Sequence, residues 1–171
     1  IREMAITDHY DPNYPLPSDI DLPEYQKALN KTKEAYQNKI KILKGIEIGM
    51  RLGKSLELGS KAANSFDYDF IIGSFHSAEG YELYEGGFFL NRSAEDSYIA
   101  FYTIVRDALL KYKDYDVLGH FNVIDRYTDR IPDYSAYWDL VEEILRIIIA
   151  DGKGLEINTS SFRYGMGDRT T

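Results

Sequence analysis

Short apolar runs alternate along the chain with longer segments in which apolar residues recur at helical spacing. This alternation is the pattern of repeated strand–helix units. The apolar runs predict strands over residues 3–8, 45–49, 68–73, 115–119 and 154–158. Helical spacing predicts helices over 22–43, 94–113 and 135–150, and a weak helix or loop over 51–64. With right-handed crossovers, such a chain would form an open arc of five parallel strands, which is an α/β fold.

Capping residues and prolines set several of the expected boundaries. Ser93 and Asp96 have the spacing of a capping box at the start of the second predicted helix, with Asp in place of Glu. Asp133 or Ser135 is expected to cap the last helix. Three prolines lie between residues 10 and 20 and exclude regular structure there, so we expect a loop.

The composition is that of a globular chain. Its 171 residues are 44% hydrophobic and 28% charged, which allows one domain with an ordinary core. No run approaches the roughly 18 apolar residues of a membrane helix, so no membrane partner is expected. A net charge of −8 disfavours a nucleic-acid partner, because such binding depends on clustered Lys and Arg. The first residues lack the basic start and apolar stretch of a secretion signal, so we expect a cytoplasmic location.

The positions of the histidines carry the most chemical information. The chain has no cysteine, so any metal ion must be held by nitrogen and oxygen. All three histidines, His9, His76 and His120, follow an apolar strand-like run, and Glu47 lies within a further such run. If the strands are parallel neighbours, these side chains gather at one end of the sheet, where α/β proteins usually build their sites. The pattern predicts a metal site.

Glu47, His76 and His120 form the strongest candidate set. Two neutral imidazoles and one carboxylate are a common catalytic coordination sphere that leaves a position for water. His9 could bind a second metal or contact a phosphate directly. The alternative for each histidine is a structural role, and Glu47 could instead pair with a lysine. Glu156 lies in a similar strand without such a histidine pattern, so strand position alone is weak evidence.

Two arginines are candidates for phosphate recognition. Arg126 and Arg163 each lie a few residues beyond the end of a predicted strand. The planar fork of a guanidinium suits bidentate contact with phosphate, although both residues could also be solvated surface arginines. Asn158, Ser160 and Ser161 could add neutral hydrogen bonds. The chain has no common Gly-rich phosphate loop and no serine in a nucleophile-elbow sequence.

Several of these motifs, in this order, resemble the polymerase and histidinol phosphatase (PHP) superfamily. The matching segments are 6–9 (ITDH), 45–49 (GIEIG), 72–77 (IGSFHS), 119–127 (GHFNVIDRY) and 156–160 (EINTS). The last two, together with residues 162–165 (FRYG), most resemble the histidinol-phosphatase branch. The resemblance spans the whole chain.

The resemblance implies a distorted (β/α)7 TIM-like barrel with up to three divalent metal ions, such as zinc, manganese or iron, at the C-terminal ends of its strands. Glu47 would bridge two metals, His76 and His120 would complete one site, and His9 would belong to another. Arg126 and Arg163 would hold the substrate phosphate. The implied activity is the metal-dependent hydrolysis of a small phosphorylated substrate, L-histidinol phosphate, in histidine biosynthesis.

The sequence also departs from the family pattern. The family's opening His-x-His and closing Asp-x-His pairs are absent, and the chain begins at Ile1. We therefore expect a single PHP-type domain over residues 1–171 that lacks the first and last strand motifs, with an incomplete barrel and metal cluster. Such a piece would be inactive or would be completed by other segments. The alternatives are a different phosphate ester, such as a phosphotyrosine or nucleotide, or a noncatalytic metal-binding domain.

Overall fold

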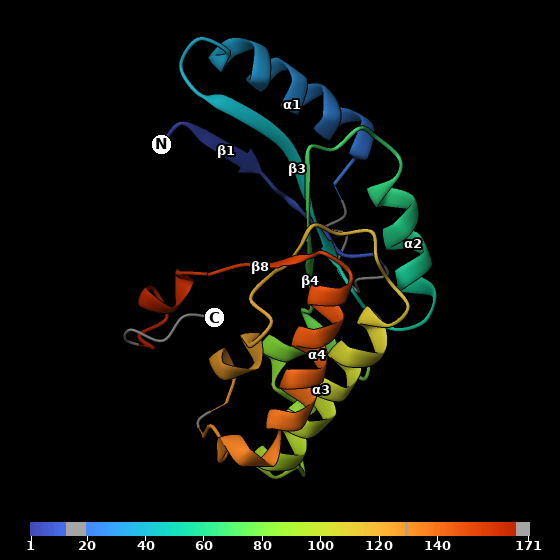
Figure 1. The fold of residues 1–171 in the computed structure, drawn as a ribbon, viewed down its shortest axis with the longest axis vertical. Helices are drawn as coiled ribbons and strands as arrows, with labels where there is room; N and C mark the ends of the chain where they lie inside the picture. Colours follow the sequence, from blue (N-terminus) through green and yellow to red (C-terminus); the bar gives the residue numbers. More distant parts are fainter. Residues whose placement is uncertain (13–19, 129, 167–171) are drawn as a thin grey trace. The chain divides into compact units, whose positions relative to one another are not determined.

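The structure is a computed structural model that describes residues 1–12, 20–128 and 130–166 (Figure 1). It divides the chain into two compact units, residues 1–73 with 114–117 and residues 74–113 with 118–171. The loop expected over residues 10–20 lies mostly at 13–19, outside the described residues.

The first unit is built around one long central strand. Its elements in chain order are β1 (Glu3–Ile6), β2 (His9–Tyr10), α1 (Leu22–Tyr36), β3 (Lys41–Gly49), α2 (Lys54–Ala63) and β4 (Phe70–Ser74), whose last residue belongs to the second unit. β1 and β2 both pair with β3 in parallel, and β4 is the neighbour of β3 on its other side. The Asp116 N–H donates to the Ile71 carbonyl at 2.8 Å, which joins the chain entering β7 (Val117–Leu118) to β4.

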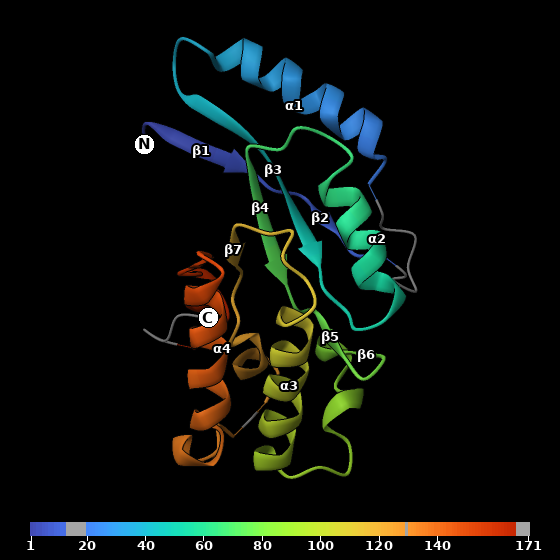
Figure 2. The ribbon, with the colours of Figure 1, turned by 45° about the vertical axis from the view of Figure 1, so that its right-hand side comes forward.

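Helix α1 packs against β3 (Figure 2). Asp21 caps its start by accepting a hydrogen bond from the Glu24 N–H at 2.9 Å, and the proline in its first turn needs no hydrogen-bond partner. Leu29 of α1 is buried together with Ile42, Ile46 and Ile48 of β3. This apolar contact fixes the helix on the sheet.

The predicted helix over residues 22–43 is too long. It ends at Tyr36, and residues 41–44 are the first half of β3, paired with β1. Ile40 and Leu43 fit the helical spacing, but the apolar, β-branched stretch also satisfies a buried strand. Periodicity cannot separate these two interpretations for a short run, and the pairing with β1 decides in favour of the strand.

The second unit combines two helices with short strands and 3-10 turns. Its strands and helices are β5 (Ser77–Ala78), β6 (Tyr81–Glu82), α3 (Ala94–Leu109), β7, α4 (Trp138–Ala150) and β8 (Gly154–Leu155). β5 and β6 form an antiparallel hairpin, and the Glu156 N–H donates to the Leu118 carbonyl at 2.9 Å beside the β7–β8 pair. The 3-10 turns are Leu83–Glu85, Gly87–Phe89, Val123–Arg126, Tyr134–Ala136 and Ser160–Phe162.

One of the two expected helix caps is confirmed, and the other caps a different element. Ser93 caps α3 as predicted, because its hydroxyl accepts from the Asp96 N–H at 3.0 Å. The side chain of Asp133 accepts from the Ser135 N–H at 2.9 Å, but it caps the 3-10 turn that precedes α4 and not α4 itself. The helix predicted over residues 135–150 therefore begins later, at Trp138, because its first residues belong to the 3-10 turn.

The described strands confirm an α/β fold with an open sheet. Among the described residues, β1 pairs with β3 only and β8 pairs with β7 only, which agrees with the expected incomplete barrel. The last two strands are shorter than predicted, with two residues each. None of the helices in the described part of the chain has the length and apolar character needed to cross a bilayer.

Buried tyrosines form part of the core between α3 and α4. Tyr98 and Tyr102 of α3 lie beside Tyr137, and the rings of Tyr102 and Tyr137 are stacked with centroids 5.4 Å apart. The Tyr98 hydroxyl donates to Asp125 Oδ1 at 2.6 Å. Burial, followed by this hydrogen bond, raises the pKa of Tyr98, and burial likewise raises the pKa of Tyr102.

We expect the chain to lose stability at alkaline pH. Burial also raises the pKa of Tyr25 to about 12, so all three phenols ionise more readily in the unfolded chain. Their contribution to the free energy of unfolding is complete below about pH 10, the ordinary tyrosine value, and is lost as pH rises through the folded values. Urea unfolding at about pH 8 and about pH 11 measures this loss. A Tyr102→Phe variant should lose less over this range, and equal stability at both pH values would contradict the expectation.

Candidate metal site

In the first unit, the register of the sheet brings His9 and Glu47 together. His9 of β2 is the direct Cα partner of Glu47 of β3, and the Glu47 N–H donates to the Asp8 carbonyl at 2.9 Å. The His9 Nε2 atom lies 3.5 Å from Glu47 Oε2, and His9 Nδ1 lies 3.7 Å from Asp11 Oδ2. Glu47 is largely buried, whereas the His9 side chain is 58% exposed. The imidazole therefore stands between two carboxylates at the C-terminal end of the sheet strands.

Gly49 leaves space for the Asp11 carboxylate beside His9. A Cβ atom on Gly49 would lie 1.7 Å from Asp11 Oδ1, so the Asp11 carboxylate occupies the space that a side chain at the end of β3 would fill. Asp11 was not among the residues that the sequence pattern selected. Its signal was weak, because it belongs to no strand and lies next to a proline.

In the second unit, two histidine rings lie side by side. The ring centroids of His76 and His120 are 5.4 Å apart, with planes at 44°. His76 is the second residue after β4, and His120 is the second residue after β7. His120 is 6% exposed and has a φ of +21°, a backbone conformation that costs a non-glycine residue free energy and that often occurs at functional sites.

Glu156 holds the backbone of His120. The His120 N–H donates to Glu156 Oε2 at 2.9 Å, and the Asn158 side-chain amide donates to the same oxygen at 3.2 Å. Glu156 was not selected from the sequence, because no histidine pattern surrounds it. The structure gives it a supporting role for a candidate ligand.

Arg126 is brought together with the neutral residues expected near it. Its Nη2 atom donates to Ser160 Oγ at 2.6 Å and to Asn158 Oδ1 at 3.3 Å, and its guanidinium lies over the Tyr164 ring, 5.1 Å from the centroid. These contacts hold the fork of the guanidinium in one orientation. Arg163 is exposed and follows the last 3-10 turn, so its role toward phosphate stays a prediction, and Ser161 is fully buried.

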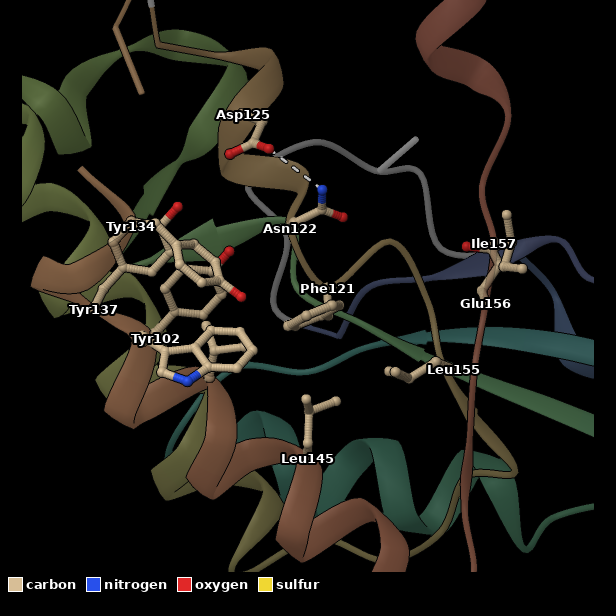
Figure 3. A pocket seen from close by; sticks show the side chains of 12 residues that line it. Tyr102, Phe121, Asn122, Asp125, Tyr134, Tyr137, Leu145, Leu155, Glu156 and Ile157 are labelled. Carbon is tan, nitrogen blue, oxygen red and sulfur yellow. Dashed lines mark hydrogen bonds between the residues drawn. The ribbon is translucent and has the colours of Figure 1, made fainter. Parts of the chain in front are cut away.

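A pocket of about 430 Å³ opens in the second unit next to the segment that follows His120 (Figure 3). Figure 3 shows the rings of Tyr102, Tyr134 and Tyr137 grouped together, with Leu155 and Ile157 of the last strand region across from them. Asn122 donates to Asp125 Oδ2 at 3.3 Å within it. The lining mixes polar and apolar side chains, and neither His76 nor His120 is among the lining residues.

The donor atoms of the first unit suit a divalent metal ion. His9 and Glu47 offer an imidazole nitrogen and a carboxylate oxygen as ligand atoms. Imidazole and carboxylate donors without thiolate suit zinc, manganese or iron. The partly buried carboxylate of Glu47 beside an imidazole supplies the negative charge that such an ion requires.

Comparison with known proteins agrees with the motifs. Residues 1–160 match the family model of the PHP domain. The chain is 30% identical over 167 residues to the histidinol-phosphatase of Lactococcus lactis subsp. lactis, and this alignment covers 95% of the chain and 62% of that protein. It is 31% identical over 162 residues to a probable histidinol-phosphatase of Clostridium acetobutylicum, and this alignment covers 91% of the chain and 61% of that protein.

A solved structure also matches. The crystal structure of histidinol phosphate phosphatase from Lactococcus lactis, complexed with zinc, L-histidinol and phosphate, gives a TM-score of 0.85 at 30% sequence identity. The match covers 95% of this chain and 64% of that one. The chain thus spans less than two thirds of the length of each of these relatives.

Proposed function

Because the chain belongs to the PHP domain family, we propose that it is part of a metal-dependent phosphomonoesterase that hydrolyses L-histidinol phosphate to L-histidinol and phosphate. The observation that carries the proposal is the match to a structure complexed with zinc, L-histidinol and phosphate, which extends over 95% of the chain. The reaction would serve histidine biosynthesis, which favours a cytoplasmic location. We further propose that residues 1–171 belong to one PHP-type domain.

We propose that four residues bind the metal ions: His9 and Glu47 from the first unit and His76 and His120 from the second. The pairing of β2 with β3 supports the first two, and the adjacent rings support the others. A divalent ion held by these residues would supply Lewis acidity toward the phosphate and the attacking water. Glu156 would keep His120 in place through its backbone N–H, in the way that supporting groups orient metal ligands.

We propose that Arg126 and Arg163 bind the phosphate group of the substrate. Arg126 is already oriented by Ser160, Asn158 and the Tyr164 ring, so it would lose little conformational freedom when it binds an anion. Its positive charge would stabilise the negative charge that builds up on the phosphate oxygens during hydrolysis. A local arginine of this kind explains how a chain with net charge −8 can accept an anionic substrate.

We expect Arg126→Lys to raise the KM for L-histidinol phosphate about tenfold, because a lysine cannot reproduce the fork of hydrogen bonds or the contact with Tyr164. Initial-rate kinetics of the full-length gene product measure this change. Arg146→Lys is the matched control, since Arg146 lies on an exposed face of α4 and pairs with Glu142. An unchanged KM in the Arg126 variant would remove this residue from the phosphate site.

A panel of phosphate esters tests the proposed substrate. The full-length gene product should hydrolyse L-histidinol phosphate with a kcat/KM about a hundredfold above that for phosphotyrosine or a nucleoside monophosphate. A preference for one of the other esters would keep the phosphatase assignment and change the substrate. Failure to hydrolyse any ester would favour a noncatalytic metal-binding role.

A further inference from the structure

The parallel pairing of the N-terminal strand with β3 is interrupted just before His9. β1 ends at Ile6, whose partner is Lys44, and β2 begins at His9, whose partner is Glu47. The offset between partners is the same on both sides of the break, 44 − 6 = 38 and 47 − 9 = 38. The register is therefore continuous across Thr7 and Asp8, although neither residue is paired with β3.

The Tyr25 hydroxyl lies at this break and contacts three backbone groups. It accepts a hydrogen bond from the Asp8 N–H at 3.0 Å. Its own proton is shared between the Ile6 carbonyl at 3.1 Å and the Gly45 carbonyl at 2.9 Å. The hydroxyl thus contacts the end of β1, the residue before β2 and the middle of β3, between the last pair of β1 and the first pair of β2.

Tyr25 is itself held firmly. It lies in the first turn of α1, whose start is capped by Asp21, and α1 packs against β3. Burial raises the pKa of Tyr25 to about 12, so the phenol keeps its proton and can donate under physiological conditions. A neutral, fixed hydroxyl is the chemical group that can donate and accept at one position.

We propose that Tyr25 is a positioning residue that sets His9 opposite Glu47 and so shapes the metal site of the first unit. The metal part of this inference rests on the proposed function. A slip of one residue would turn His9 to the opposite face of the sheet, and ligand distances in metal sites vary by only about 0.2 Å. Tyr25 holds the N–H of Asp8, and the carbonyl of the same residue accepts from the Glu47 N–H, so Asp8 links the hydroxyl to the backbone of Glu47.

The test is Tyr25→Phe, which removes only the hydroxyl. Its control is Tyr36→Phe, in which the altered ring belongs to the same helix but is 46% exposed. Amide hydrogen exchange of the metal-free chain should speed up about tenfold at Asp8 and Glu47 in the first variant. Exchange at Lys44, whose N–H donates to Asp69 at 2.9 Å, should stay unchanged. Zinc affinity of the full-length gene product, measured by competition with a chelator, should fall about tenfold.

The two readouts separate this inference from the proposed function. Faster exchange at Asp8 and Glu47 with weaker zinc binding supports the positioning role, whereas exchange and zinc affinity equal to those of the Tyr36 variant overturn it. A uniform rise in exchange over α1 and β3 also overturns it, because the hydroxyl would then serve general stability. If the unaltered full-length gene product binds no zinc, the metal assignment fails, and the exchange rates at Asp8 and Glu47 alone decide whether Tyr25 sets the register.

Discussion

Replacing Glu47 with glutamine should lower the zinc affinity and the phosphatase rate of the full-length gene product by at least about a hundredfold. Glutamine has nearly the same size and keeps an oxygen acceptor, but it lacks the negative charge that binds a cation. Glu47 lies 3.5 Å from the His9 imidazole and is largely buried, so solvent screens its charge little and no neighbouring water can supply the lost negative charge. Elemental analysis of the purified protein and initial rates with L-histidinol phosphate measure the two effects.

The matched control for this variant is Glu57→Gln. Glu57 is exposed in the first turn of α2, and the same change of charge there should leave zinc content and rate unchanged. A Glu47→Gln protein that keeps its zinc and its rate would show that Glu47 is not a ligand. The remaining interpretation would then be a structural carboxylate that only contacts His9.

The second large effect is expected at Gly45, where β3 is crowded on both sides. A Cβ atom there would lie 2.5 Å from Thr7 Cγ2 and 2.9 Å from the carbonyl oxygens of Ile6 and Phe70. Backbone on both neighbouring strands cannot yield easily, so Gly45→Ala should cost about 3 kcal/mol of folding free energy. The change also displaces the Ile6 and Gly45 carbonyls that accept from Tyr25, and zinc affinity should fall with it.

Urea unfolding at neutral pH measures the cost, and Gly73→Ala supplies the comparison. A Cβ on Gly73 would meet the Met50 side chain at 3.0 Å and Tyr115 Cβ at 3.2 Å. The flexible end of Met50 can move aside, so this variant should lose clearly less stability than Gly45→Ala. Equal losses in the two variants would contradict the crowding deduced for Gly45.

The fold class was predictable because the apolar runs were long enough to identify the strands. β4 ends at residue 74, one residue after the predicted end of that strand. α3 begins directly after Ser93, the residue that the capping sequence indicates. The error at the end of α1 has a physical cause. The apolar residues over 40–44 satisfy helical spacing and strand burial equally, and only pairing with β1, a contact distant in sequence, distinguishes them.

The site was predictable in part. His9 and Glu47 were selected from their positions after and within strands, and the sheet makes them Cα partners. Asp11, Glu156 and Tyr25 were not selected, because their contacts depend on backbone groups that only the folded chain brings near. Tyr25 is one of 15 tyrosines, and nothing in its local sequence marks it from the others. The roles of His9, Glu47, His76 and His120 as metal ligands, and of Arg126 and Arg163 as phosphate contacts, stay predictions.

The most direct test of the metal-dependent phosphatase is the rate of L-histidinol phosphate hydrolysis by the full-length gene product, measured after metal removal and again after zinc is restored. The proposed activity predicts no hydrolysis by the stripped protein, and recovery of the rate as zinc binds. Undiminished hydrolysis without metal, or a zinc-loaded protein that leaves L-histidinol phosphate intact, would contradict it.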